Sequence, residues 1–171
     1  MKTIIVGFSR PIKPTIFSRA IQWSEGTNYD HVYIKWNWAS VDRDVIYQAS
    51  KLAVNFESNT TFDAYSVTIE EYELSVDDEI YKEIMQFCID NSNKPYSVLE
   101  IVGFTYVAIC AMLKQQVHNP FPTHAASFVC SKLIDNILLI AKVTDIRVSS
   151  DDVTPLMLNQ MIKAAGLKRI T

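Results

Sequence analysis

The chain has few of the residues that cross-link small secreted domains or hold zinc. It contains three cysteines, at positions 88, 110 and 130, and three histidines. An odd number of widely and irregularly spaced cysteines, without a C-x-x-C pair, fits neither a disulfide framework nor a zinc site. We therefore expect reduced thiols.

An excess of positive charge is also absent. Sixteen Lys and Arg stand against 19 Asp and Glu, the formal net charge is −3, and the basic residues are scattered along the sequence. Proteins that bind nucleic acid or an anionic membrane present a concentrated basic patch. Nucleic acid is therefore not an expected partner.

No apolar run has the length of a membrane span. The longest, Val98 to Leu113, is interrupted by Glu100 and is shorter than the roughly 20 residues that a spanning helix needs. The stretch from Ile4 to Phe8 is too short for the apolar part of a signal peptide. We expect no integral membrane segment and no export signal, and thus a cytoplasmic or virus-associated protein.

The composition that remains is that of a globular domain. Of the 171 residues, 49% are hydrophobic and 20% are charged, which is enough apolar material for one core. We find no internal repeat, low-complexity tract or linker. A single domain over residues 1–171 is expected.

Hydrophobic periodicity divides the chain into strands and helices. Runs rich in β-branched and aromatic residues predict strands, and a 3.6-residue period predicts helices. The predicted strands are 4–9, 31–38, 44–49, 51–56, 67–74 and an edge strand within 167–170. The predicted helices are 15–25, 76–91, 98–113, 127–142 and 155–165. This order indicates an α+β fold in which a small antiparallel sheet packs against helices.

Two of these helices carry specific end signals. Gly26 is placed as the stop of the 15–25 helix, whose inner face we expect to hold Ile16, Ala20, Ile21 and Trp23. In the last helix, Thr154 is the expected N-cap and Pro155 the first helical residue.

Cys130 is a candidate nucleophile. It lies three residues after Ser127, a predicted N-cap, so its sulfur would lie in the first turn of a helix. Backbone N–H groups and the positive end of the helix dipole stabilise a thiolate there. The alternative is a small buried hydrophobe, the commonest role of an unpaired cysteine. Cys88 and Cys110 fall on apolar helical faces and are predicted core residues.

His31 is the candidate base for this nucleophile. Strand alternation places it on one face with Tyr33 and Lys35, opposite Val32. An imidazole beside a thiol can take its proton and later protonate the leaving group. The alternative is a hydrogen-bonded or exposed histidine without a catalytic role.

A histidine base needs an acceptor that holds its other ring nitrogen. Gln48, on the strand after the histidine strand, is the best-placed candidate. An amide oxygen fixes the tautomer without adding a charge, although a glutamine without catalytic duty is an equal alternative. His118 and His124 lie in a proline-rich loop without metal-ligand spacing, and His124 is near enough to Cys130 in sequence to line the same cleft.

Together these motifs resemble the circularly permuted papain-like hydrolases of the NlpC/P60 superfamily, in the YiiX/YaeF-like branch. There the histidine strand precedes the cysteine helix. The family's Y-S-H-V-G-I strand is echoed by Tyr29–Ile34, its V-x-E-A strand by Ile46–Ala49 and its C-S-E-L-V helix by Cys130–Ile134. Its P-Y-D and Ser/Thr-Pro motifs are similar to residues 95–97 and 154–155.

The resemblance implies a papain-like α+β fold in which Cys130 is the nucleophile, His31 the base and Gln48 the third member, with no metal or cofactor. Two departures are evident. Gln48 stands where many relatives carry an acidic residue, and Lys132 replaces the glutamate after the cysteine.

Three functions follow as hypotheses. The first is a cysteine hydrolase of the amidase or peptidase type, which cleaves an amide or ester bond in a cell-wall peptide or acyl amino acid. The second is a lipid acyltransferase or deacylase, suggested by the apolar 98–113 helix and by Trp23, Trp36 and Trp38 as cleft walls. The third is a catalytically idle binding or structural module, suggested by the two departures.

Overall fold

The computed structural model describes residues 1–50, 53–95, 129–144 and 153–171, together with residues 103, 106, 110, 115 and 117. In chain order the elements are β1 (Lys2–Pro11), α1 (Ile16–Glu25), β2 (His31–Trp38), β3 (Arg43–Ser50), β4 (Ala53–Ser58), α2 (Asn59–Asp63), β5 (Ser66–Val76), α3 (Asp78–Asn91), α5 (Cys130–Ile140), α6 (Pro155–Ala164) and β6 (Lys168–Arg169).

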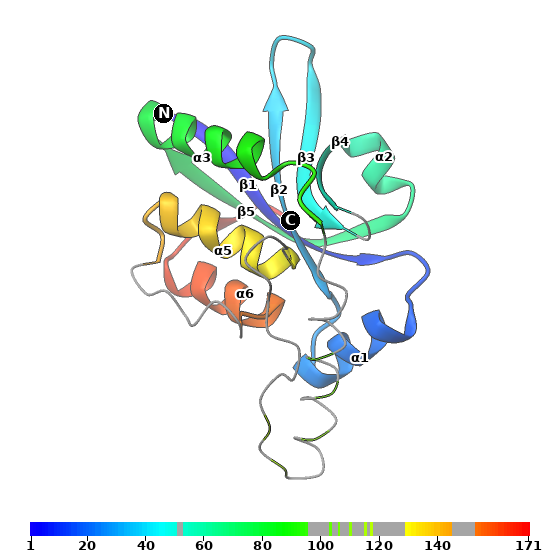
Figure 1. The fold of residues 1–171 in the computed structure, drawn as a ribbon. Coiled ribbons are helices and arrows are strands. Elements are labelled where there is room, and N and C mark those ends of the chain that lie inside the picture. Colours follow the sequence, from blue (N-terminus) through cyan, green and yellow to red (C-terminus); the bar gives the residue numbers. More distant parts are fainter. Residues whose placement is uncertain are drawn as a thin grey trace.

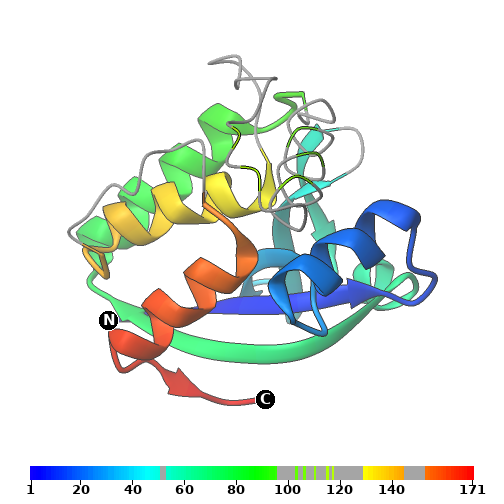
Figure 2. The ribbon, with the colours of Figure 1, turned by 90° about the horizontal axis from the view of Figure 1, so that it is seen from below.

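The strands form one six-stranded sheet in the order β4-β3-β2-β1-β5-β6, and every neighbouring pair is antiparallel. Helices α3, α5 and α6 cover one face of this sheet (Figures 1 and 2). The smaller α2 packs against β3, β4 and β5. The predicted α+β class with an antiparallel sheet is therefore confirmed.

Most predicted elements are present, with boundaries that differ by a few residues. β2 matches its prediction, β1, β3 and β5 are longer, and β4 extends from Ala53 to Ser58. β6 pairs with the end of β5, as expected of an edge strand. The five-residue α2 was not predicted, because a helix of that length has no measurable period. Residues 51–52 lie outside the described residues, and so does the predicted 98–113 helix apart from Gly103, Tyr106 and Cys110.

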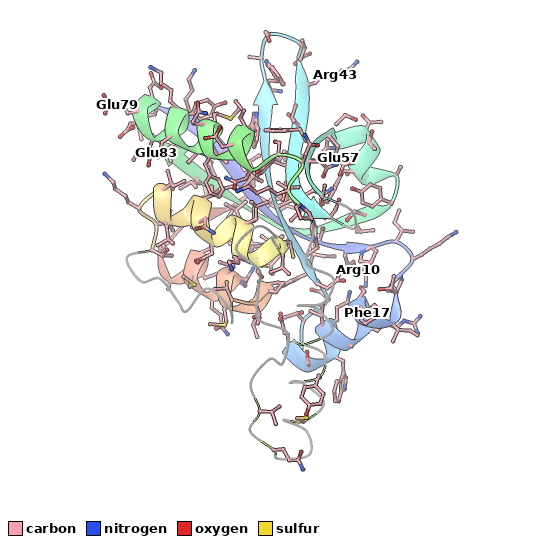
Figure 3. The ribbon with its side chains drawn as sticks, viewed as in Figure 1. Arg10, Phe17, Arg43, Glu57, Glu79 and Glu83 are labelled. Carbon is pink, nitrogen blue, oxygen red and sulfur yellow. The ribbon has the colours of Figure 1, made fainter. Side chains whose placement is uncertain are left out.

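Helix α3 has the predicted amphipathic character. Asp77 caps its first turn by accepting a hydrogen bond from the N–H of Ile80 at 2.8 Å. Ile84 and Cys88 are buried, while Glu79 and Glu83 lie on the opposite, exposed side (Figure 3). The prediction that Cys88 is a core residue is confirmed.

The inner face predicted for α1 is wrong at Ile16 and Trp23, whereas Ala20 and Ile21 are half-buried and the ends of the helix are as predicted. Thr15 caps it, and Gly26 ends it in the left-handed conformation. Ile16 and Trp23 are exposed (85% and 60%), and Ser18 is the buried residue of the helix. The polar face is turned inward because its side chains hydrogen-bond near the site described below.

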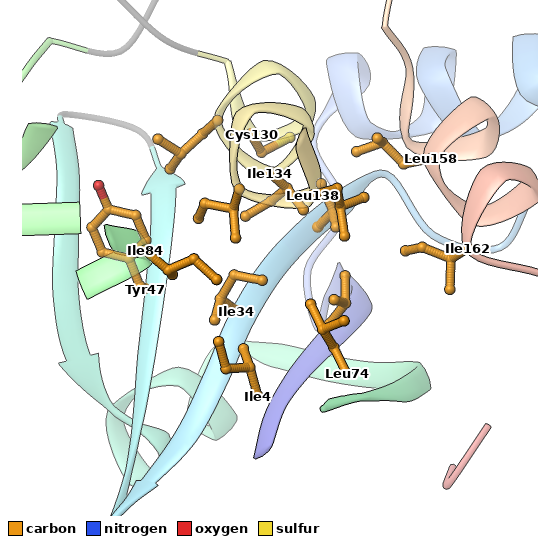
Figure 4. Close-up of a cluster of buried hydrophobic side chains, with 14 of the residues drawn as sticks. Ile4, Ile34, Tyr47, Leu74, Ile84, Cys130, Ile134, Leu138, Leu158 and Ile162 are labelled. Carbon is orange, nitrogen blue, oxygen red and sulfur yellow. The ribbon is translucent and has the colours of Figure 1, made fainter. Parts of the chain in front are cut away.

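The main core lies between the sheet and the three covering helices. Its apolar side chains come from every layer: Ile134 and Leu138 of α5 face Ile4, Ile34 and Leu74 of the sheet, with Tyr47, Ile84, Leu158 and Ile162 around them (Figure 4). Cys130 belongs to this cluster, at the first turn of α5. The core thus fixes where the start of α5 meets the sheet.

A second, smaller cluster lies on the α2 side of the sheet and consists of Tyr33, Ile46 and Phe62. The Tyr33 hydroxyl donates to Glu71 at 2.9 Å. Its ring lies over Gly7, its cross-strand partner. A Cβ atom on Gly7 would lie 2.1 Å from the Tyr33 Cζ atom, so the ring requires glycine beneath it.

In the part of the chain that the structure describes, no helix combines the length and apolar character needed to cross a bilayer.

Candidate active site

Cys130 is the first residue of α5 and is 6% exposed. The predicted first-turn position is therefore correct. The predicted cap is not, since Val129 occupies the N-cap and makes no side-chain capping bond, and Ser127 lies outside the described residues. Without a capping side chain, the first-turn N–H groups are left to other acceptors.

His31 and Gln48 are joined by a hydrogen bond of 2.6 Å between Nε2 and Oε1. His31 is the first residue of β2, and the paired register of β2 with β3 runs only from Ile34–Tyr47 to Trp38–Arg43. The two side chains thus bridge the strands just beyond the point where backbone pairing stops.

The amide nitrogen of Gln48 is hydrogen-bonded as well. Its Nε2 atom donates to the hydroxyl of Tyr65 at 2.7 Å and to a carboxylate oxygen of Glu57. The Tyr65 hydroxyl donates to the same carboxylate. The NH2 group of Gln48 therefore faces two acceptors, and its oxygen is left for His31.

The hydrogen bonds of Gln48 assign the tautomer of His31. Because Gln48 Oε1 can only accept, His31 Nε2 must carry the proton and donate it. In the neutral ring, Nδ1 then has the free lone pair. Nδ1 is accordingly the nitrogen able to take a proton from a nucleophile.

The Cys130 sulfur lies against the segment that contains His31. The backbone N–H of Val32 hydrogen-bonds to the sulfur and favours its ionised form, and the carboxylate of Asp30 opposes ionisation. Asp30 and Val32 flank His31 in the chain. The structure therefore brings the start of α5 and the start of β2 together.

Burial raises the pKa of Cys130 to about 12, with Asp30 and Glu25 adding to the effect. The sequence-based expectation of a stabilised thiolate is wrong for this state. The N–H groups of Val32 and Ser131 lower the pKa, but they do not offset the loss of water around a buried anion.

Burial also lowers the pKa of His31, and the hydrogen bond to Gln48 and the nearby Asp30 oppose this only in part. An imidazole with a pKa below its usual 6.5 is neutral at pH 7. The resting pair is therefore a neutral thiol and a neutral imidazole, not a thiolate–imidazolium ion pair.

Helix α1 and the start of α6 surround this pair with polar side chains. Gln22 donates to Asp30 at 3.1 Å, and Glu25 accepts from the N–H of Leu156 in the first turn of α6 at 3.0 Å. Thr154 caps α6 as predicted. These contacts explain why α1 turns its polar face inward.

Sequence reasoning missed Glu25, Asp30, Glu57 and Tyr65, because their roles depend on contacts between distant segments. His118 and His124 lie outside the described residues. Of the tryptophans, Trp36 is buried, while Trp23 and Trp38 are exposed. Cys110, like Cys88, is buried, as predicted.

Comparison with known proteins gives a relationship at the level of fold. No protein-family model matches the chain, and no curated protein matches its sequence. The crystal structure of "metalloprotein yiiX" from Escherichia coli O157:H7 superposes with a TM-score of 0.57 at 13% identity, over 95% of this chain and 81% of that one. At this identity the likeness shows that the two chains share a fold.

Proposed function

We propose that the protein is a cysteine hydrolase of amide or ester bonds, built as a single permuted papain-like domain over residues 1–171. Cys130 is the nucleophile, His31 the base and Gln48 the orienting residue. The observation that carries the proposal is the 2.6 Å bond from His31 to Gln48. It leaves Nδ1 free on a residue whose chain neighbour, Val32, hydrogen-bonds through its N–H to the Cys130 sulfur.

The chemistry starts from the neutral pair. As the sulfur forms a bond to the substrate carbonyl carbon, its proton passes to His31 Nδ1, and first-turn N–H groups of α5 stabilise the carbonyl oxygen. The bond to the leaving amine or alcohol then breaks, and the imidazolium protonates that group. Water next attacks the thioester, its proton moves to Nδ1, and the thiol is restored when the acid leaves.

An uncharged residue is sufficient to orient the His31 imidazole in this cycle. Gln48 holds the tautomer through its oxygen, and Asp30 lies near enough to favour the imidazolium as it forms. The shared fold with yiiX supports the permuted papain-like reading, since that name belongs to the branch whose motif order the sequence resembles. The second hypothesis, lipid acyl transfer, depended on the 98–113 segment, of which only residues 103, 106 and 110 are described. It also depended on three tryptophans, of which Trp36 is buried in the core and Trp23 and Trp38 are exposed.

The neighbour's description as a metalloprotein raises the question of a metal here. The described residues contain no group of three His, Cys, Asp or Glu side chains arranged to hold an ion. His31 Nε2 is already committed to Gln48. A metal does not fit these residues, and no step of the proposed cycle uses one.

The proposal predicts that p-nitrophenyl acetate, a small activated ester, acetylates Cys130 at pH 7.5. Intact-protein mass spectrometry followed by peptide mapping should place the acetyl group on Cys130, and p-nitrophenol release should continue as the thioester is hydrolysed. Cys130→Ala should abolish both signals, whereas Cys88→Ala, which removes a core thiol outside the site, should retain them.

Acetylation spread over lysines, with equal p-nitrophenol release from wild type and Cys130→Ala, would instead show that the protein is a catalytically idle binding or structural module. The raised pKa of Cys130 and the neutral Gln48 are the observations that favour that alternative.

A further inference from the structure

Gln48 is held by two residues that no part of the proposed cycle uses. Glu57 lies on β4 (Figure 3), the strand next to β3, and pairs with Ile46, two residues before Gln48. Tyr65 follows α2. Both contact the amide nitrogen of Gln48, whose side chain is almost completely buried.

We propose that Glu57 and Tyr65 are positioning residues that keep His31 in its productive tautomer by fixing the orientation of the Gln48 amide. The proposal rests on the proposed function, because it concerns the proton of the same imidazole. It extends the site from three residues to a chain of five.

The hydrogen-bonding capacity of each group decides which way the Gln48 amide points. A carboxylate accepts but does not donate, so Glu57 can face the NH2 of Gln48 and not its oxygen. If the amide rotated by half a turn, two oxygens would face each other at Glu57, and an NH2 would face His31 Nε2. Glu57 therefore excludes the rotated amide, and the oxygen stays at His31.

Tyr65 closes the arrangement. Burial and the hydrogen bond to Glu57 raise the pKa of its phenol, so the hydroxyl keeps its proton, accepting from Gln48 and donating to Glu57. Its place is set by α2: the Tyr65 N–H donates to the Phe62 carbonyl at 3.1 Å, and the two rings are 5.7 Å apart. The short helix that sequence analysis missed thus anchors this part of the chain.

The test is Glu57→Gln, which keeps the shape but lets residue 57 donate as well as accept. Both orientations of Gln48 are then satisfied. In the rotated one His31 Nε2 must accept, which moves the ring proton to Nδ1, the nitrogen needed by Cys130. Without the carboxylate that favours one orientation, the two have similar energies, so about half of the protein should hold the unproductive tautomer. We therefore expect acetylation by p-nitrophenyl acetate to slow about twofold.

The decisive readout is the tautomer, from the ¹⁵N resonances of the His31 ring at pH 7. Wild type should show protonated Nε2, and Glu57→Gln should show a substantial fraction with protonated Nδ1. Glu57→Asp, which keeps the charge, should restore the wild-type tautomer. Tyr65→Phe removes one of two acceptors and should shift the tautomer less. Glu83→Gln, the same change at an exposed position of α3, should have no effect.

A wild-type tautomer in folded Glu57→Gln, confirmed by its circular dichroism spectrum, would overturn the positioning role whatever the rate. Because the ¹⁵N readout needs no substrate, it also separates the two proposals. A tautomer shift in a protein whose wild type is not acetylated would uphold the role of Glu57 and reject the hydrolase.

Discussion

At pH 8, iodoacetamide should alkylate Cys130 in the folded protein about a thousandfold more slowly than it alkylates a free cysteine. Alkylation proceeds through the thiolate. Burial raises the pKa of Cys130 to about 12, so about one thiol in ten thousand is ionised at pH 8, against roughly a quarter for an ordinary pKa of ~8.5. Cys130 should therefore be alkylated slowly and yet be acetylated, since His31 removes the thiol proton only while a carbonyl is attacked.

The pH dependence distinguishes this account from that of a preformed ion pair. For a single thiol whose pKa is high, the rate should keep rising with pH, without a plateau between pH 6 and 9. Cys88, whose pKa burial also raises to about 12, is the internal control, and denaturant should release both thiols. Fast alkylation of Cys130 with a plateau near neutral pH would show that the thiolate is already present.

Gly7→Ala should lower the free energy of unfolding by about 3 kcal/mol, the upper part of the range for overpacking a core. The added methyl group would lie 2.1 Å from the Tyr33 ring. That ring is fixed, because it is buried between the sheet and Phe62 and its hydroxyl is bound to Glu71 and Thr68. Chemical denaturation of both proteins measures the difference.

The matched control is Gly26→Ala. Gly26 has φ of +64° and no heavy atom within 4 Å of an added Cβ, so only backbone strain of about 1 kcal/mol opposes that change. Equal losses in the two variants would mean that the Tyr33 ring moves aside at little cost.

The strands and long helices could be predicted because their signals are local. Period-2 alternation identified His31–Trp38, and cap residues such as Thr154 identified a helix start. The orientation of α1 could not be predicted, since it depends on hydrogen bonds from Gln22 to Asp30 and from the Leu156 N–H to Glu25, which join α1 to other segments. The same limit applies to Cys130: its place at a helix start predicts a low pKa, whereas burial and the carboxylates of Asp30 and Glu25 raise it.

In the candidate site, too, some residues could be predicted from the sequence and others could not. Cys130, His31 and Gln48 were identified from motif order, and the structure places His31 against Gln48. Glu57 and Tyr65 carry no motif and are separated from Gln48 by 9 and 17 residues. Only the pairing of β3 with β4 and the turn of α2 bring them together.

The claim that His31 is the base for Cys130 is tested most directly by measuring acetylation of Cys130 in His31→Ala, under conditions where circular dichroism shows both proteins folded. General-base catalysis contributes roughly 10²- to 10⁴-fold. The rate at which p-nitrophenyl acetate acetylates Cys130 should therefore fall about a thousandfold, with no change in background labelling of lysines. An unchanged rate at Cys130 would contradict the account, because the thiol would then react without its histidine.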